Sequence, residues 1–248
     1  MAKRKKVKKT IDDFYANLVF INKVLKQNKH EFNRYVWGID ISLSNPAVSI
    51  YEIGKPTSGI KKIAKYMSHY SHKFKGTQYE RIFKIEKSFR DLVAKFPPCL
   101  VVIEGYAFSS SQWRELMGEV SYAVKRNFIK SGIHINGTPE AYPCLIVPPT
   151  SLKKFVTGKA MKVDKEEMHG TIQSWGFDTS NNDESDSAGL CLIGLNIMNL
   201  SVIDIRKINQ IKFFKDGPFP KELSHQWDAL KNIVMNDGGN IQRFFVEN

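Results

Sequence analysis

One apolar stretch near the start of the chain, Tyr35–Ile53, constrains the fold more than any other. Its β-branched and apolar residues are typical of two buried strands, and the Ser-Leu-Ser-Asn-Pro segment between them is a turn whose bend is fixed by Pro46. The first strand ends at Asp40. A carboxylate in such a run is costly to bury unless it binds something. Asp40 therefore indicates a site whose other members come from elsewhere in the chain.

Two other segments place acidic side chains at comparable positions. The run CLVVIEGYAF is a short buried strand followed by a carboxylate, Glu104. The segment 181–186 opens a long apolar helix, on which Asp183 and Asp186 lie three residues apart and share one face. Each acid alone has an ordinary explanation, as a turn residue or as an N-terminal cap that complements the helix dipole. Their joint occurrence with Asp40 favours a functional acidic site.

Apolar residues at helical spacing alternate with further strands along the rest of the chain. Helices are predicted over residues 11–25, 78–95, 113–130, 150–156, 164–175, 181–200 and 223–234. Two more strands are predicted at 59–67 and 145–147. His69 and His72 follow the first of them, and because no third ligand is nearby they are interpreted as exposed loop histidines. The helix over 11–25 packs on its own domain or on a second subunit, and own-domain packing is the more ordinary outcome.

The chain carries a large positive charge. Its 248 residues include 37 Lys and Arg and 25 Asp and Glu, which gives a formal net charge of +12, and six of the basic residues lie within the first ten positions. This excess favours a polyanionic partner such as nucleic acid, although a solubilising surface would give the same composition.

The cysteines and the hydropathy pattern indicate a cytoplasmic protein. Cys99, Cys144 and Cys191 are far apart and lack metal-binding spacing, so they are predicted to be buried, reduced thiols. No apolar run reaches the length of a membrane span, so no membrane partner is expected. The basic N-terminus is not followed by the apolar region and cleavage site of a secretory signal.

The order of these elements resembles that of the RuvC group of Holliday junction resolvases. The matching stretches are WGIDISLSNPAVSI, LVVIEGYAF, VPPTSLKKFVTGKAMKVDKEEM and NDESDSAG. The resemblance implies an α/β fold of the ribonuclease H-like kind, with a five-stranded mixed sheet flanked by helices. It makes 35–200 the nuclease domain, 1–34 a basic tail with an amphipathic helix, and 201–248 a C-terminal extension. The segment VPPTSLKKFVTGK is most similar to the corresponding segment of members encoded by bacteriophages, which would place the protein in the host cytoplasm.

The resemblance implies a metal centre made of four acids. Asp40 is similar to the first-strand acid that bridges two metal ions, Glu104 to the acid of the fourth strand, and Asp183 and Asp186 to the pair on the last helix. Four converging carboxylates would repel one another without a cation. Mg²⁺ and Mn²⁺ prefer such oxygen ligands, and two of these ions roughly 4 Å apart assist phosphodiester hydrolysis. Two ions per active site are therefore expected. The first strand has Asp-Ile-Ser where the family commonly has Asp-Pro-Gly.

Basic and aromatic residues in the matching stretches are candidates for DNA contacts. Lys153 and Lys165 match lysines that the family places beside its active site, where they would bind phosphate or stabilise developing charge. Tyr106 or Phe108 matches an aromatic residue that wedges into the junction. The full set of DNA-binding candidates is Tyr106, Phe108, Lys153, Lys154, Lys159 and Lys165. A basic loop such as the one around Lys159 is also commonly a solvated surface.

Together these patterns predict a homodimeric, metal-dependent endonuclease that cuts branched DNA, Holliday junctions first, in recombination or repair. A homodimer suits a four-way junction because both have near two-fold symmetry. Two alternatives stay open: another ribonuclease H-like nuclease that cuts flaps or RNA–DNA hybrids, and a non-catalytic DNA-binding protein that retains the fold. Cleavage of junction, flap, duplex and hybrid substrates, with and without metal, separates the three.

Overall fold

Five strands form a mixed sheet in the spatial order β3-β2-β1-β4-β7. The computed structural model describes residues 16–17, 19–21, 35–55, 58–105, 114–135, 138–202 and 224–236. The strands of the sheet are β1 (Tyr35–Asp40), β2 (Ala47–Glu52), β3 (Met67–Ser71), β4 (Pro98–Glu104) and β7 (Cys144–Val147). β1 pairs antiparallel with β2 and parallel with β4, while β2–β3 is antiparallel and β4–β7 parallel.

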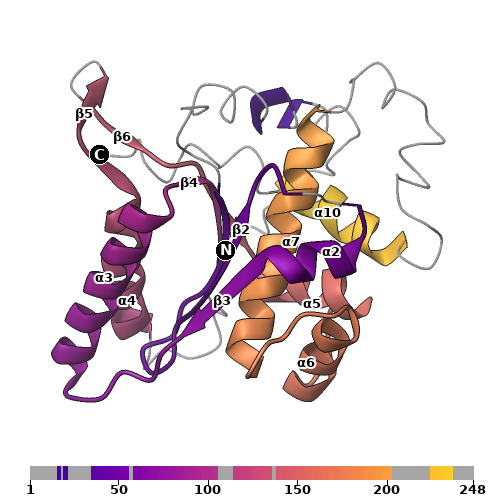
Figure 1. Ribbon diagram of the computed structural model, residues 1–248, viewed down its shortest axis with the longest axis horizontal. Helices are drawn as coiled ribbons and strands as arrows, with labels where there is room; N and C mark the ends of the chain where they lie inside the picture. The colour runs from indigo at the N-terminus through magenta and orange to yellow at the C-terminus, as the bar shows by residue number, and fades with distance from the viewer. Residues whose placement is uncertain are drawn as a thin grey trace, which may run out of the picture.

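Helices cover both faces of this sheet (Figure 1). On one face lie α3 (Gln78–Lys95) and α4 (Arg114–Lys125). The other face carries α2 (Ile60–Tyr66), α5 (Pro149–Thr157), α6 (Lys165–Ser174), α7 (Asn182–Val202) and α10 (Ser224–Asn236). The predicted α/β fold with a five-stranded mixed sheet flanked by helices is confirmed.

Alternation along β1 explains why its residues divide between two cores. Val36 packs in the cluster that contains α7, whereas Trp37 and Ile39 pack in the cluster that contains α3 and α4. By the same two-residue period, Gly38 and Asp40 lie on the α7 face. The helix on that face is central to the fold, since every residue from 187 to 195 is buried, which is typical of a helix enclosed by protein on all sides.

A close approach between β1 and α7 depends on glycine. A Cβ atom on Gly38 would lie 2.1 Å from the Ser187 carbonyl oxygen and 2.2 Å from the Cys191 backbone nitrogen. On the helix side, a Cβ on Gly194 would lie 2.8 Å from the Val102 side chain and 2.9 Å from that of Val36. These two glycines therefore let the helix lie directly on the strands that carry Asp40 and Glu104.

The third strand begins later than predicted. The segment 59–67 was expected to be a strand, but it forms α2 over Ile60–Tyr66, and β3 starts at Met67. Ile60, Ile63 and Ala64 pack against the α7-face core, and their spacing of three and four is that of a helix. The apolar run was too short for its period to decide between the two structures.

His69 does not lie in a loop as predicted. It is a half-buried residue of β3, and its Nδ1 atom lies 2.7 Å from the Ser49 hydroxyl on β2. Burial lowers the pKa of His69, so the neutral imidazole is favoured in the fold. His72 follows the strand and is exposed, as expected.

The helix predicted over 113–130 is shorter in the structure. It ends at Lys125, followed by the 3₁₀ turn η1 (Arg126–Phe128) and by a hairpin that was not predicted, β5 (Ile129–Ile135) with β6 (Thr138–Ala141). Phe128 is fully buried, and its ring meets that of Trp37 edge to face at 5.8 Å between centroids. Anchoring this ring in the core ends the helix before the hairpin.

The remaining predicted helices and the strand at 145–147 are present, with shifts of one or two residues at most ends. Of the helix predicted over 11–25, only 16–17 and 19–21 lie within the described residues. Ile21 is fully buried in the α7-face cluster, and the Asn17 amide donates to the Val234 carbonyl at 2.8 Å. This part of the helix therefore packs on the chain's own core, next to α10.

The three cysteines are buried and unbridged, as predicted. Burial raises the pKa of the Cys99 and Cys144 thiols to about 12, so neither is a reactive thiolate. Among the described helices, none combines the length and the apolar character needed to cross a membrane.

Candidate active site

The predicted acids come from three elements that meet at one edge of the sheet. β1 and β4 are parallel neighbours, so their final residues, Asp40 and Glu104, end at the same edge. Leu100 and Val102 of β4 pack in the α7-face core, and the two-residue period therefore turns Glu104 to the same face as Asp40. The N-terminus of α7 reaches this edge as well, because Asn45 in the turn after β1 contacts Asp183.

The four carboxyl groups interact within one buried cluster. Burial raises the pKa of Asp40 well above its usual value, and the negative charges of Glu104, Asp186 and Asp183 raise it further. Burial also raises the pKa of Glu104, although a hydrogen bond with Asp40 opposes the increase. Two adjacent buried carboxyls that share a hydrogen bond do not both ionise readily, so the pair favours binding a proton or a cation. The pKa of Asp186 rises to about 7, through burial first and the charge of Glu104 second.

Two lysines balance part of this negative charge. Lys153 lies on α5 and Lys165 is the first residue of α6. Both ammonium groups lower the pKa of Glu104 and of Asp186, so both lie near the acidic cluster, and their predicted role in catalysis stays a prediction. Lys153 Nζ also donates to the Val163 carbonyl at 3.4 Å. Cations next to buried carboxylates are also suited to contacting a phosphate that approaches them.

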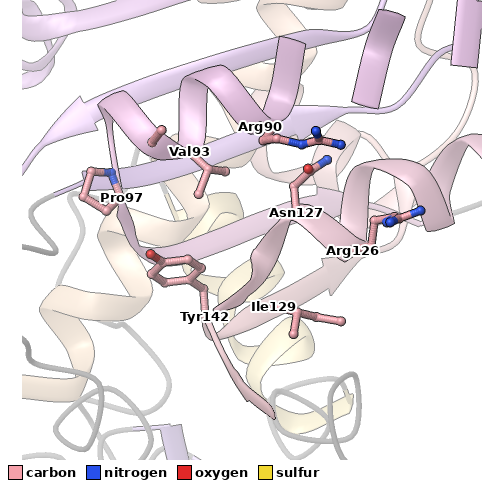
Figure 2. A pocket seen from close by; sticks show the side chains of 8 residues that line it. Arg90, Val93, Pro97, Arg126, Asn127, Ile129 and Tyr142 are labelled. Carbon is pink, nitrogen blue, oxygen red and sulfur yellow. The ribbon is translucent and has the colours of Figure 1, made fainter. Parts of the chain in front are cut away.

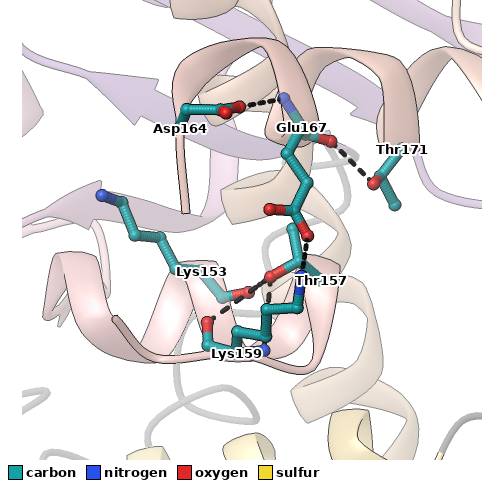
Figure 3. A network of polar contacts seen from close by, with 6 residues as sticks. All are labelled: Lys153, Thr157, Lys159, Asp164, Glu167 and Thr171. Carbon is teal, nitrogen blue, oxygen red and sulfur yellow. Dashed lines mark hydrogen bonds and ion pairs between the residues drawn. The ribbon is translucent and has the colours of Figure 1, made fainter. Parts of the chain in front are cut away.

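Lys159, by contrast, is engaged in a separate network on α5 and α6 (Figure 3). Its ammonium forms an ion pair with Glu167 at 2.8 Å, and in the figure Lys153 points away from this pair. Glu167 is itself fixed by the Asp164 side chain, which accepts from its backbone N–H at 2.6 Å. The charge of Lys159 is thus already compensated within the protein.

The other predicted DNA contacts lie apart from the cluster or outside the described residues. Lys154 follows Lys153 on α5 and is half-buried. Tyr106 and Phe108 fall in the range 106–113, which lies outside the described residues. The predicted wedge into a junction therefore stays a prediction.

The sequence reasoning missed Asn45, which positions one of the acids. Its side-chain amide donates to Asp183 at 2.5 Å. The Ser42 hydroxyl accepts from the backbone N–H groups of Ser44 and Asn45 at 3.3 and 3.2 Å, which is a serine turn. The Ser-Leu-Ser-Asn turn thus fixes Asn45, and the signal was present in this polar cluster.

Glu184 was also missed, and it fixes the start of α7 against β3. Its buried carboxylate accepts from the Ser71 hydroxyl at 2.6 Å and from the Ser180 backbone N–H at 2.7 Å. A buried carboxylate that accepts several hydrogen bonds holds its surroundings rigidly. Glu184 therefore sets the position of the helical turn that presents Asp183 and Asp186.

The chemistry of the donor set fits a hard divalent cation. The ligands available from Asp40, Glu104, Asp183 and Asp186 are carboxylate oxygens, which Mg²⁺ and Mn²⁺ prefer. Their mutual repulsion, seen in the raised pKa values, is what a cation would relieve. Among the described residues, however, no group of three or more His, Cys, Asp or Glu side chains is placed so that it could hold a metal ion.

We expect the stability of the metal-free protein to fall as pH rises through neutrality. The pKa of Asp186 is about 7 in the fold against 3.8 ordinarily, so between these values the folded state binds more protons than the unfolded chain. The free energy of unfolding therefore decreases with rising pH across this window. Urea denaturation with a chelator should give a lower value at about pH 7.5 than at about pH 5, and Asp186→Asn should reduce the difference. A free energy of unfolding that rises over this interval would contradict the assignment.

Comparisons with known proteins give matches among solved structures alone. No protein-family model and no curated protein sequence matches the chain. Thermus thermophilus RuvC is similar at 15% identity, covering 67% of this chain and 97% of its own, with a TM-score of 0.48. Fowlpox virus resolvase, solved with Holliday junction DNA, is 15% identical over 67% of this chain and 98% of its own, with a TM-score of 0.36. The yeast mitochondrial Holliday junction resolvase Ydc2 is 11% identical over 92% and 93%, with a TM-score of 0.37.

Proposed function

We propose that the chain is a metal-dependent, structure-selective endonuclease that cuts branched DNA, with the Holliday junction as first substrate. One observation supports this most: Asp40, Glu104 and Asp186 have raised pKa values because they and Asp183 share one buried cluster, with two lysines beside it. Such a cluster destabilises the fold of a protein that does not use it. Clusters of perturbed acids are typical of catalytic centres.

The proposed chemistry is hydrolysis of a phosphodiester. Asp40, Glu104, Asp183 and Asp186 would hold two divalent ions, Mg²⁺ or Mn²⁺, which when bound supply an activated water and charge relief at the leaving oxygen. The protein's own part is to orient these carboxylates from three rigid elements, and Asn45 holds Asp183 in place. Lys153 and Lys165 would contact the phosphate and stabilise the charge that develops on it.

The choice of a DNA junction follows from the sequence. The motifs around the acids resemble those of the RuvC group, and the net charge of +12 suits a polyanionic substrate. A homodimer with one site per subunit would match the near two-fold symmetry of a four-way junction. The bacteriophage origin, the cytoplasmic location and the division at residues 34 and 200 stay predictions.

The deciding experiment is nicking of a synthetic four-way junction by the full chain. We expect cuts in Mg²⁺ or Mn²⁺, placed symmetrically on opposing strands, and none with a chelator. Flap, plain duplex and RNA–DNA hybrid of the same sequence serve as controls, since preference for one of them would move the assignment to another nuclease of this fold. Junction binding without metal-dependent cutting would instead indicate a DNA-binding protein that is not an enzyme.

A further inference from the structure

Several hollows border α3, and the charges that line two of them differ. At the C-terminal end, a hollow of about 690 Å³ is lined in part by Arg90 and Arg126 (Figure 2). Glu86 pairs with both, at 2.8 Å from Arg90 and 3.4 Å from Arg126. The amide of Asn127 is likewise bound, donating to the Ala123 carbonyl at 2.8 Å. The polar groups here are satisfied within the protein, so this hollow gives no sign of a ligand.

The hollow along the middle of α3 is strongly basic. It measures about 720 Å³ and lies between the loop after β3 and α3; we call it the β3–α3 groove. Its lining residues are the loop residues 72–75 together with Lys84, Lys87, Ser88 and Asp91. Four of these residues are exposed lysines, and one is an acid. Within the described part of the chain, no ion pair includes any of the four lysines, in contrast to the arginines at the C-terminal end of α3.

The groove lies at the same edge of the sheet as the acidic cluster. Asp40 pairs with Ala47 on β2, and Ala47 pairs with Ser71, the last residue of β3. Two strand spacings separate Asp40 from Ser71, which is about 10 Å. The loop that lines the groove starts at the next residue. Asp40 faces α7 whereas the groove lies on the α3 side, so a DNA backbone that contacts both places would cross this end of the sheet.

The groove is built on rigid elements and is joined to the candidate site. The backbone N–H of Phe74 donates to the Ser44 carbonyl at 3.1 Å, in the turn that also fixes Asn45. The Phe74 ring packs on the α3-face core, and Lys84 Nζ donates to the Lys75 carbonyl at 2.9 Å. Thr77 and Glu80 form a capping box at the start of α3. These contacts fix the backbone of the loop and the Lys84 ammonium before any ligand arrives, which lowers the entropy cost of binding.

Exposed aromatic rings adjoin the lysines on α3. Tyr79 is 74% exposed and Phe83 is 66% exposed, although their spacing was read as part of the helix's apolar pattern. They lie four residues apart on one face, followed by Lys87. Rings interleaved with basic residues are typical of surfaces that bind unpaired nucleic acid. The rings alone would also suit a second copy of the chain, but a two-fold contact there would bring two groups of like-charged lysines together.

We propose that the β3–α3 groove binds the phosphate backbone of the DNA beside the scissile site, through Lys73, Lys75, Lys84 and Lys87. This proposal rests on the proposed function, since it assigns a second contact surface to the same substrate. It adds a surface on the β3 side of the acidic cluster, whereas Lys153 and Lys165 lie on the β7 side. The substrate would then be held on both sides of the carboxylates.

The test compares two variants that lose equal charge. The groove variant carries Lys73→Ala, Lys75→Ala, Lys84→Ala and Lys87→Ala. The control carries Lys61→Ala, Lys62→Ala, Lys65→Ala and Lys95→Ala, which are exposed lysines on α2 and at the end of α3. The C-terminal ends of α2 and α3 lead into the first residues of β3 and β4, and these lie at the end of the sheet opposite to Asp40. Binding of a labelled four-way junction is measured with a chelator over a range of salt, and thermal melts confirm that both variants fold.

We expect the groove variant to bind at least about tenfold more weakly at roughly 100 mM salt, with the slope of log K against log salt reduced by about 2 to 4. The control should stay within about twofold of wild type. Equal losses in both variants, or wild-type binding by the groove variant, would overturn the proposal. So would a shift in sedimentation that shows the groove to be an interface between copies. If the groove variant loses binding but the wild-type protein does not cut the junction, the groove proposal stands and only the enzyme assignment is overturned.

Discussion

Replacing Asp40 by Asn should abolish metal-dependent junction cleavage, by at least roughly 10³-fold, while junction binding stays within about twofold of wild type. Burial raises the pKa of Asp40, and the negative charges of all three other acids raise it further, so its carboxyl group lies close to each of them. The amide of Asn keeps the shape of this side chain and can donate to Glu104. What the substitution removes is the negative charge that two cations would share.

The same variant gives a second, independent readout. Because burial disfavours an ionised Asp40, Asp40→Asn should leave the metal-free fold at least as stable as wild type near neutral pH. The matched control is Asp178→Asn, an exposed aspartate ahead of α7 that should cut normally. Initial rates of nicking, junction binding in chelator and urea denaturation together separate loss of chemistry from loss of fold. An Asp40→Asn protein that cuts at the wild-type rate would remove the mechanism.

The placement of the acids could be predicted from the sequence to a large extent. Apolar residues two apart in β1 and β4 already indicate which face each strand buries, and Asp40 and Glu104 each fall at the end of such a run. What the sequence could not provide was the pairing of these strands, because residues more than 60 positions apart become neighbours only through the β1–β4 ladder. The family resemblance supplied that step.

The errors arose where local patterns were short or where tertiary contacts decided the outcome. The run 59–67 contained both a helical spacing at Ile60 and Ile63 and an apolar end at Met67, and packing on the α7-face core selected the helix. Phe83 shares the helical spacing of the apolar residues of α3, yet the structure exposes it. Asn45 was missed because its role is to donate a hydrogen bond to Asp183, which is 138 positions away in the sequence.

Replacing Gly38 by Ala should destabilise the protein by more than about 3 kcal/mol, or prevent folding. The added Cβ would lie 2.1 Å from the Ser187 oxygen and 2.2 Å from the Cys191 nitrogen, both backbone atoms of α7. A flexible side chain could rotate away from such a contact, but a helix buried on all sides can relieve it only by moving as a whole. Since α7 carries Asp183 and Asp186, that movement would separate them from Asp40, and cleavage should be lost together with stability.

Gly118→Ala is the matched control, because it adds the same methyl group where nothing lies within 4 Å. Gly118 is an exposed residue in the interior of α4, so alanine there should stabilise the protein by about 0.5–1 kcal/mol. Thermal and urea denaturation of both variants measures the difference in their stability. Junction cleavage is then assayed for each variant that folds. If Gly38→Ala melted within a few degrees of wild type, α7 could not lie directly on β1. The acids of the two elements would then have no common site.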